Sequence, residues 1–217
     1  MSSSRRRKRR LGSGISCRDA REPRFGRPTP IPRWWRSSAS GSSRGPGNTG
    51  KLAAENFLEC YHCAVAHPGF SALVDVSPDA YELTLGDAFS SQFGPVRENG
   101  SGLDTEGEVA RSQFHFLWPN TMVNIFPGRT NLSIGPVLPA GPERTERFLD
   151  YFFGPEVEQG WIGELLEFDG QVGAEDKVLV ENVQRGVATG LIERGRLLPE
   201  SERLIVDFQQ RIRNALS

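Results

Sequence analysis

The sequence predicts an α+β fold, and three observations support this prediction. Residues 51–63 form a segment of good helix formers without Gly or Pro. Segments that alternate apolar and polar residues follow between residues 112 and 153, which is the pattern of antiparallel strands. Helical patterns return after residue 155. A helix, then a run of strands, then C-terminal helices is an α+β arrangement.

The elements are expected in the following order. The helix over 51–63 is broken by Pro68 and Gly69. Strands are expected over 80–86, 112–118, 121–126, 130–138 and 144–153, of which the first is weak and the others resemble an antiparallel meander. Helices are expected over 156–168, 172–189 and 202–216.

The first 50 residues differ from the rest of the chain. They contain 13 of the 26 Lys and Arg residues but just two acids, Asp19 and Glu22, and they are rich in Ser, Gly and Pro without periodicity. We therefore expect a disordered basic tail over 1–50 and a folded, acidic domain over 51–217. The arginine run Arg5–Arg10 also suits a nucleic-acid-binding or targeting segment, although we do not expect nucleic acid as the partner. A third interpretation is translation from a wrong start or in a wrong frame.

The three cysteines, Cys17, Cys60 and Cys63, make no disulfide framework. Free cysteines predict a reducing compartment. No apolar run reaches transmembrane length, and no apolar segment of a secretory signal follows the basic N-terminus. The sequence therefore predicts a cytoplasmic protein that does not associate with a membrane.

Two carboxylates and an imidazole recur along the expected helix over 51–63. Glu55, Glu59 and His62 stand at i, i+4 and i+7, so they share one helix face, which is either solvated or lines a site. His67 lies five residues beyond His62, and five residues turn an ideal helix roughly 140° away from the starting face. Both histidines can bind one metal only if the helix ends or distorts between them, which Pro68 makes plausible.

Cys60 and Cys63 offer a competing Cys-x2-Cys zinc or redox pair. A structural zinc site needs four ligands, and these two cysteines with His67 supply three. We favour buried cysteines that pack as small apolar residues.

A second constellation is a carboxylate within an apolar stripe. Val172, Asp176, Leu179, Val183 and Val187 follow helical spacing, so Asp176 interrupts an otherwise apolar face. A buried carboxylate is costly unless it is paired, protonated or bound to a metal. The alternative is an acid at the edge of the stripe, near the helix start, where it suits the helix dipole.

A buried Asp176 needs a cation, and the two histidines suggest one. Two histidines and one carboxylate on one side of a metal form the facial triad of non-haem Fe(II) oxygenases, which leaves positions open for O₂ and substrate. Zinc is the alternative metal.

Three segments resemble the catalytic, mononuclear iron domain of Rieske-type aromatic-ring-hydroxylating oxygenase α subunits. They are Lys51–Phe70, which contains Glu-Asn-Phe-Leu-Glu-Cys-Tyr-His and the second histidine, Phe116–Asn120, and the segment that begins with Glu175 and Asp176. The resemblance extends from about Lys51 to about Phe208.

The resemblance implies a fold and roles for residues. The implied fold is the helix-grip (START/Bet v 1-like) domain, an antiparallel sheet around a long C-terminal helix. His62, His67 and Asp176 correspond to the iron ligands. Glu59 corresponds to the acid that couples the iron to the Rieske cluster of a neighbouring subunit, and Asn56 to a position near the open side of the metal.

The implied activity is reductive activation of O₂ at Fe(II), which hydroxylates or demethylates an aromatic or quaternary ammonium substrate. Its electrons would come from an NAD(P)H-dependent reductase or ferredoxin through the Rieske centre, in a homotrimer. Glu at position 59 resembles family members that act on quaternary ammonium compounds such as carnitine. Aromatic residues of the strands either line the substrate pocket or are ordinary core: Phe114, Phe116, Trp118 and Phe126.

The chain departs from the family at its N-terminus. A Rieske [2Fe–2S] cluster needs two cysteines and two histidines, whereas residues 1–50 contain Cys17 and no histidine. We therefore expect a truncated or mis-started version of a longer enzyme, active when a Rieske centre is supplied. The alternative is a non-catalytic helix-grip module that binds a ligand.

Overall fold

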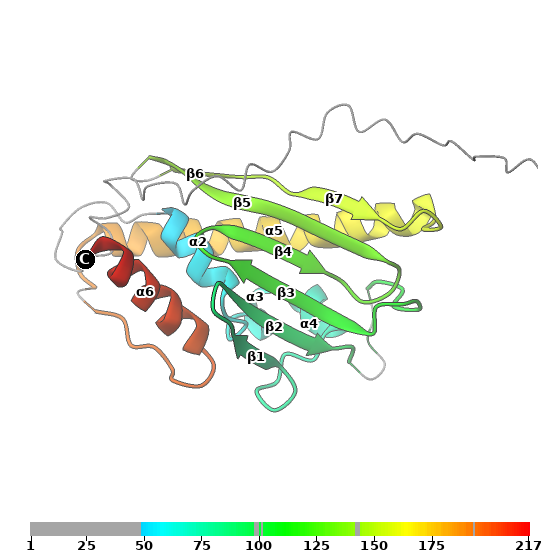
Figure 1. Cartoon of the computed structure of the whole chain (residues 1–217), viewed down its shortest axis with the longest axis horizontal. Helices are drawn as coiled ribbons and strands as arrows, with labels where there is room; N and C mark the ends of the chain where they lie inside the picture. Colours follow the sequence, from blue (N-terminus) through cyan, green and yellow to red (C-terminus); the bar gives the residue numbers. More distant parts are fainter. Residues whose placement is uncertain (1–48, 98–99, 101, 142–143, 193) are drawn as a thin grey trace, which may run out of the picture. The chain divides into compact units, whose positions relative to one another are not determined.

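The alternating segments of the sequence form one seven-stranded antiparallel sheet (Figure 1). The structure is a computed structural model and describes residues 49–97, 100, 102–141, 144–192 and 194–217, so the expected tail over 1–50 lies outside it except for its last two positions. The strands are β1 (Glu82–Leu85), β2 (Phe89–Pro95), β3 (Arg111–Leu117), β4 (Thr121–Ile125), β5 (Asn131–Gly141), β6 (Arg144–Arg147) and β7 (Asp150–Phe153). Strands β1 to β6 are neighbours in chain order, and β7 also pairs with β5.

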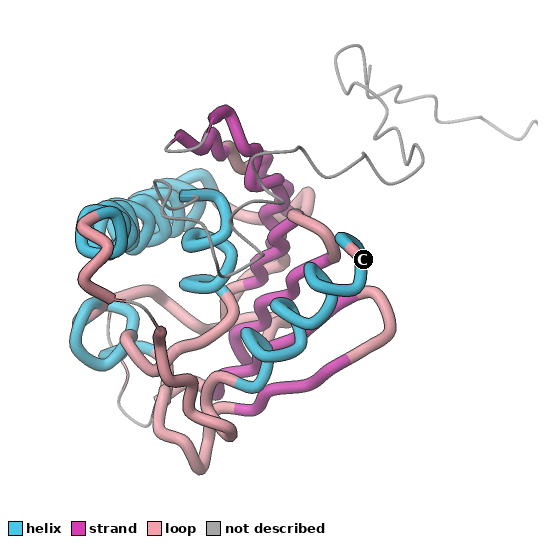
Figure 2. Tube along the Cα trace, turned by 90° about the vertical axis from the view of Figure 1, so that its left-hand side faces the viewer, coloured by secondary structure: helices cyan, strands magenta, loops and turns pink. Residues whose placement is uncertain are grey.

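Five helices accompany the described part of the sheet. They are α2 (Thr49–Phe57), α3 (Cys63–Ala66), α4 (Pro68–Leu73), α5 (Gln159–Ala188) and α6 (Arg203–Leu216). Figure 2 shows α5 and the short helices on one side of the strands. The α+β class is thereby confirmed, with α5 as the long helix along the sheet (Figure 1). None of the helices in the described ranges is long and apolar enough to span a membrane.

Strand β3 shows how the sheet acquires a buried face. Ser112, Phe114 and Phe116 are buried and alternate with more exposed residues, as expected for a strand with one face against a core. Because opposite residues in an antiparallel pair point to the same face, Met122 opposite Phe116 and Asn124 opposite Phe114 are buried there too.

Two groups of buried side chains cover this inner face. The first, which we call the α6 cluster, consists of Ala54, Leu58, Leu83, Phe116, Met122, Val137, Leu204, Ile205, Phe208 and Ile212. The second, which we call the site cluster, consists of Cys60, Cys63, Phe70, Leu73, Val74, Leu103, Phe114, Phe126, Trp161 and Leu165.

Helix α5 is longer than the sequence predicts. We expected two helices, 156–168 and 172–189, but the chain is helical without a break from Gln159 to Ala188. Gly170 and Gly173 lie inside it, and a glycine in a helix interior costs about 1 kcal/mol rather than ending the helix. Packing of Trp161, Leu165 and Val180 against the rest of the domain offsets that cost.

The expected strand over 144–153 is interrupted. Strands β6 and β7 pair with β5 one after the other, with Val137 opposite Arg147 and Ile134 opposite Asp150, and the register with β6 shifts between Pro139 and Gly141. Between them the carbonyl oxygen of Phe148 lies where a Cβ on Gly135 would be, so only glycine permits this close approach. Strand β2 was not predicted, because its segment buries Ser90, Ser91 and Gln92 and so lacks the alternation of apolar residues.

Candidate metal centre

The two histidines are brought together by a break in the helical structure. The expected helix over 51–63 was too long: α2 ends at Phe57, and the chain turns before the single helical turn α3 begins at Cys63. His62 precedes α3, and His67 follows it and precedes Pro68, the first residue of α4. The Nε2 atoms of His62 and His67 are consequently 3.1 Å apart. The distortion that two histidines at this spacing require is therefore present.

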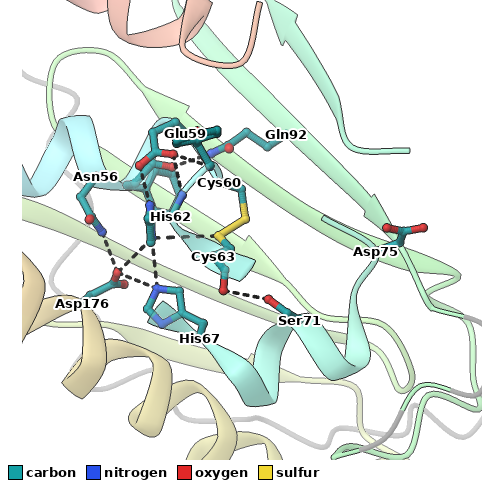
Figure 3. Close-up of a disulfide and its surroundings, with 12 residues drawn as sticks. Asn56, Glu59, Cys60, His62, Cys63, His67, Ser71, Asp75, Gln92 and Asp176 are labelled. Carbon is teal, nitrogen blue, oxygen red and sulfur yellow. Dashed lines mark hydrogen bonds and ion pairs between the residues drawn. A yellow bond between two sulfur atoms is a disulfide. The ribbon is translucent and has the colours of Figure 1, made fainter. Parts of the chain in front are cut away.

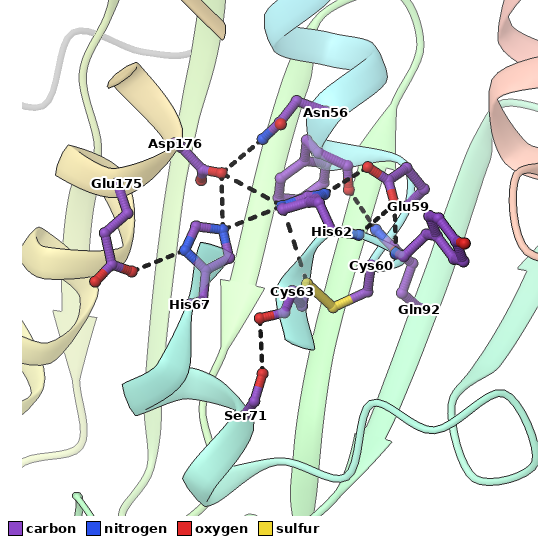
Figure 4. A network of polar contacts seen from close by, with 12 residues as sticks. Asn56, Glu59, Cys60, His62, Cys63, His67, Ser71, Gln92, Glu175 and Asp176 are labelled. Atoms are coloured by element: carbon purple, nitrogen blue, oxygen red, sulfur yellow. Dashed lines mark hydrogen bonds and ion pairs between the residues drawn. A yellow bond between two sulfur atoms is a disulfide. The ribbon is translucent and has the colours of Figure 1, made fainter. Parts of the chain in front are cut away.

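Helix α5 supplies the third group. The Oδ1 atom of Asp176 lies 3.0 Å from Nε2 of His67 and 3.6 Å from Nε2 of His62 (Figure 4). Ligand atoms about 2.1 Å from one metal ion and at right angles to each other would be about 3.0 Å apart. The three residues form a group that could hold a metal ion, and their separations fit one face of a metal. The donor set suits Fe(II), and also zinc.

Each of these groups is oriented by a neighbour. Oε1 of Glu59 is 2.5 Å from Nδ1 of His62, and Oε2 of Glu175 is 2.8 Å from Nδ1 of His67. A carboxylate at Nδ1 fixes that nitrogen as the N–H donor and leaves the Nε2 lone pair for a metal. The Nδ2 group of Asn56 donates to Oδ1 of Asp176 at 2.6 Å.

The surroundings of the site favour the positively charged form of both histidines and the ionised form of Asp176. Burial alone lowers the pKa of His62, but hydrogen bonds to Asp176 and Glu59 outweigh it and raise this pKa to about 9. The pKa of His67 is raised as well, since hydrogen bonds to Asp176 and Glu175 outweigh its burial. Burial raises the pKa of Asp176, but hydrogen bonds from both histidines and Asn56 lower it overall. In the metal-free protein protons therefore supply the charge that a cation would supply.

A pocket opens beside the three groups. His62, His67 and Asp176 line it, and aromatic side chains from α2, α4 and the inner face of the sheet form much of its wall. Of the four aromatic residues proposed from the sequence, Phe114 and Phe126 line this pocket. Phe116 and Trp118 do not, because they pack edge-on against Phe208 of α6.

Cys60 and Cys63 are buried among apolar side chains as we expected, but the structure corrects our prediction that they are free thiols. Cys60 and Cys63 form a disulfide beside the histidines, with Cα atoms 4.9 Å apart (Figure 3). The two residues span a tight turn in which the N–H of Cys63 donates to the carbonyl oxygen of Cys60, and this separation lies within the range of disulfides. Their sulfur atoms are bonded to each other and are not zinc ligands. The inference of a reducing compartment from free cysteines loses its premise.

The structure also separates residues that we placed on one helix face. Glu55 forms an ion pair with Lys51 and accepts a hydrogen bond from Gln209, away from the histidines. Glu59 lies beyond the end of α2 and reaches His62 through the turn. Sequence reasoning missed Glu175, although a second acid directly before Asp176 was a signal that the resemblance left without a role.

Comparisons with known proteins identify the family of the chain. The family model described as the catalytic domain of the ring-hydroxylating alpha subunit matches residues 51–217. The carnitine monooxygenase oxygenase subunit of Acinetobacter pittii is 34% identical over 157 residues, which cover 70% of this chain and 42% of that protein. The chloroplastic choline monooxygenase of Arabidopsis thaliana is 30% identical over 151 residues, which cover 67% of this chain and 34% of that protein.

A solved structure shows the same fold. A quaternary ammonium Rieske monooxygenase superposes with a TM-score of 0.65 at 30% identity, over 79% of this chain and 48% of that one. The chain thus spans less than half the length of these relatives. Residues 51–217 match throughout, so the chain belongs to the family of ring-hydroxylating alpha subunits, in its catalytic domain.

Proposed function

We propose that this chain is the iron-binding catalytic domain of a Rieske-type monooxygenase that acts on a quaternary ammonium compound. The observation that carries the proposal is the approach of His62 Nε2, His67 Nε2 and Asp176 Oδ1 within 3.6 Å of one another. Such a cluster of two imidazoles and one carboxylate is the ligand set of non-haem Fe(II) oxygenases. Bound Fe(II) would supply the activation of O₂.

The chain's own residues hold the ligands in position. Glu59 and Glu175 keep the Nδ1 protons of the two histidines, and Asn56 holds the carboxylate of Asp176. His67 is 2% exposed, so water reaches its ring poorly. The aromatic wall that includes Phe114 and Phe126 provides an apolar site for the substrate beside the ligands.

Glu59 is the proposed point of electron entry. Its carboxylate contacts His62 Nδ1 on the side of the ring opposite the ligand atom, and the neighbouring Tyr61 is exposed. One solved relative is described in its title as showing inter-subunit electron transfer. We propose that a Rieske [2Fe–2S] centre of another subunit meets this chain at Glu59, in a homotrimer that receives electrons from a reductase.

The substrate class follows from the relatives. Carnitine and choline, named for the activities of the matched proteins, are both trimethylammonium compounds. Aromatic faces attract such cations, so the aromatic pocket is compatible with them. An aromatic-ring substrate, which the sequence left open, is less well supported because both groups of relatives act on quaternary ammonium compounds.

Iron analysis tests the ligand set. The full chain, loaded with Fe(II) under anaerobic conditions, should bind one iron, and His62→Ala and Asp176→Ala should each lose it. His115→Ala is the matched control, because the third histidine hydrogen-bonds Ser91 outside the group of three. Unchanged iron content in either ligand variant would count against the proposal.

Oxygen uptake separates the enzyme from a non-catalytic ligand-binding module. The iron-loaded chain, given a reduced Rieske protein in trans and carnitine or choline, should consume O₂, whereas a binding module would hold iron without uptake. Glu59→Gln should keep its iron and lose most of this coupled uptake, since it removes the proposed link to the electron donor. Normal uptake by that variant would refute the role of Glu59.

A further inference from the structure

A row of residues crosses the inner face of the sheet beneath α5. Gln92 of β2 lies opposite Phe114 of β3, which lies opposite Asn124 of β4. Asn124 is in turn opposite Ser133 of β5, and Ser133 is opposite Tyr151 of β7. Since opposite residues share a face, the five side chains form one line across the sheet. The line ends at Tyr151, whose hydroxyl donates to Oδ2 of Asp169 on α5 at 2.7 Å.

Asp169 belongs to the same pocket as the proposed metal ligands. Asp169, Val172, Gly173 and Asp176 follow helical spacing on one face of α5, and all four line the pocket. Seven residues of α-helix advance about 10 Å, so Asp169 lies that far along α5 from Asp176. A small substrate held near the metal ligands would extend toward Asp169.

Among the described residues, no cationic group forms a short ion pair with the carboxylate of Asp169. It is 6% exposed, and its hydrogen-bond donor is the neutral hydroxyl of Tyr151. Within the described ranges no Lys, Arg or His comes within 4 Å of it, and Arg147, which also lines the pocket, acts on it from a greater distance. Burial raises the pKa of Asp169. A buried carboxylate in this state is stabilised by a cation that enters the pocket.

A second buried group near Asp169 is also without a partner. Asn124 is 5% exposed and lines the pocket; its Nδ2 donates to Ser133, but its Oδ1 has no hydrogen bond among the described residues. Buried polar atoms of native proteins are nearly always satisfied, so an acceptor left free in a pocket points to a ligand. This part of the pocket thus presents an unpaired acceptor atom and a buried carboxylate, with Arg147 as a further lining residue.

Aromatic side chains line the same pocket. The ring centroids of Phe114 and Phe126, two of these side chains, lie 5.6 Å apart. Aromatic faces together with a nearby carboxylate are the environment that binds a quaternary ammonium group, which offers charge but no N–H donor.

We infer that Asp169 selects the cationic head of the substrate: its carboxylate attracts a quaternary ammonium group held against Phe114 and Phe126. This inference rests on the proposed function and assigns the charge preference of the pocket to one side chain. The hydrogen bond from Tyr151 does not by itself require a charged group at position 169, because the neutral side-chain oxygen of an asparagine would accept it as well.

Binding of a charged and an uncharged probe tests the inference. The full chain is loaded with Fe(II) under anaerobic conditions, and its iron content is measured. It is then titrated calorimetrically with choline and with dimethylbutanol. Dimethylbutanol is the neutral analogue of choline, in which carbon replaces the ammonium nitrogen. The wild type should bind choline at least about tenfold more tightly than the neutral analogue. Asp169→Asn should lose most of that preference while binding of the neutral analogue stays the same.

Three further variants isolate the charge from the packing. Asp169→Glu should restore part of the preference, and Tyr151→Phe should keep it, because the carboxylate remains. Glu164→Gln, an exposed acid on α5, should leave both affinities unchanged.

The inference is overturned if Asp169→Asn keeps the preference for choline, if it weakens both probes equally, or if the iron-loaded wild type binds the two probes alike or neither of them. Failure of the wild type to bind iron would instead overturn the proposed function.

Discussion

The two ends of one sheet face are used in opposite ways. Beneath α6, the α6 cluster is built from apolar side chains of the sheet, of α2 with the adjoining Leu58, and of α6. Beneath α5, the strands bury Gln92, Asn124 and Ser133, and the polar side chains of His67 and Asp169 are buried beside them. Burial of apolar surface stabilises a fold, whereas burial of polar groups costs free energy unless each is satisfied. Both ends contain an apolar cluster, but the α5 end also buries several polar side chains, which we propose serve binding.

The largest expected effect is on the free energy of unfolding, and it tests the stabilising role of the α6 cluster. Phe208 is 2% exposed and packs edge-on against Phe116 and Trp118. Phe208→Ala should lower the free energy of unfolding by about 3–5 kcal/mol, because it removes a ring and leaves a cavity. Urea denaturation of the metal-free protein measures this loss.

The matched control lies on the same helix. Val206 is 44% exposed, and Val206→Ala should change the free energy of unfolding by less than about 0.5 kcal/mol. The folded fraction of Phe208→Ala should still bind one iron. If that variant instead keeps its stability and loses its iron, the division of the sheet face into two parts is wrong.

The sequence predicts the apolar part of the fold better than the polar part. Strands β3 and β4 were placed within one residue at each end because their residues alternate regularly. Strand β2 was missed, since its buried serines and glutamine lack the alternation of apolar residues, and of these three Gln92 lines the pocket. The continuous α5 was divided at its glycines, whose cost is offset by tertiary packing that a local pattern does not contain.

The candidate site shows the same limit. The resemblance indicated His62, His67 and Asp176, and the structure brings these three residues together, while their binding of iron remains a prediction. The Cys-x2-Cys spacing offered a redox pair, but we preferred cysteines that pack as apolar residues, and the structure instead joins Cys60 and Cys63 in a disulfide. Asp169 gave no signal of its own, because only the pairing of β5 with β7 brings Tyr151 to it.

A smaller effect, on the affinity for iron, is expected when the carboxylate at Nδ1 of His67 is replaced. Glu175→Gln replaces the acceptor at His67 Nδ1 by an amide, which weakens the hold on the tautomer and lowers the basicity of Nε2. The affinity for iron should fall about 10–100-fold, with little change in stability. Competition with a chelator of known affinity measures it.

An exposed acid on α5 provides the control for this variant. Glu181 faces solvent one helical turn beyond Lys177, and Glu181→Gln should leave the iron affinity unchanged. If Glu175→Gln and the wild type bind iron with equal affinity, the hydrogen bond to Nδ1 of His67 does not contribute to iron binding.

The smallest expected effect is the change of the affinity for iron over a single pH unit. The pKa of His62 is raised from 6.5 to about 9 in the metal-free protein, so at pH 7 iron must displace a proton from this ring. Between pH 7 and 8 the affinity for iron should therefore rise about tenfold per proton displaced. Calorimetry in two buffers of different ionisation enthalpy counts the protons released.

Stability of the metal-free protein should depend on pH in the opposite direction. A histidine whose folded pKa lies above its unfolded value contributes stability that is fully present below pH 6.5 and is lost as the pH rises through about 9. The metal-free protein should thus unfold more easily at pH 9.5 than at pH 6.5, while its affinity for iron increases over the same interval. Phe208→Ala should keep both slopes, because the α6 cluster contains no titratable side chain. Asp176→Asn should flatten the pH dependence of stability in the metal-free protein, because it removes one of the two carboxylates that raise the pKa of His62.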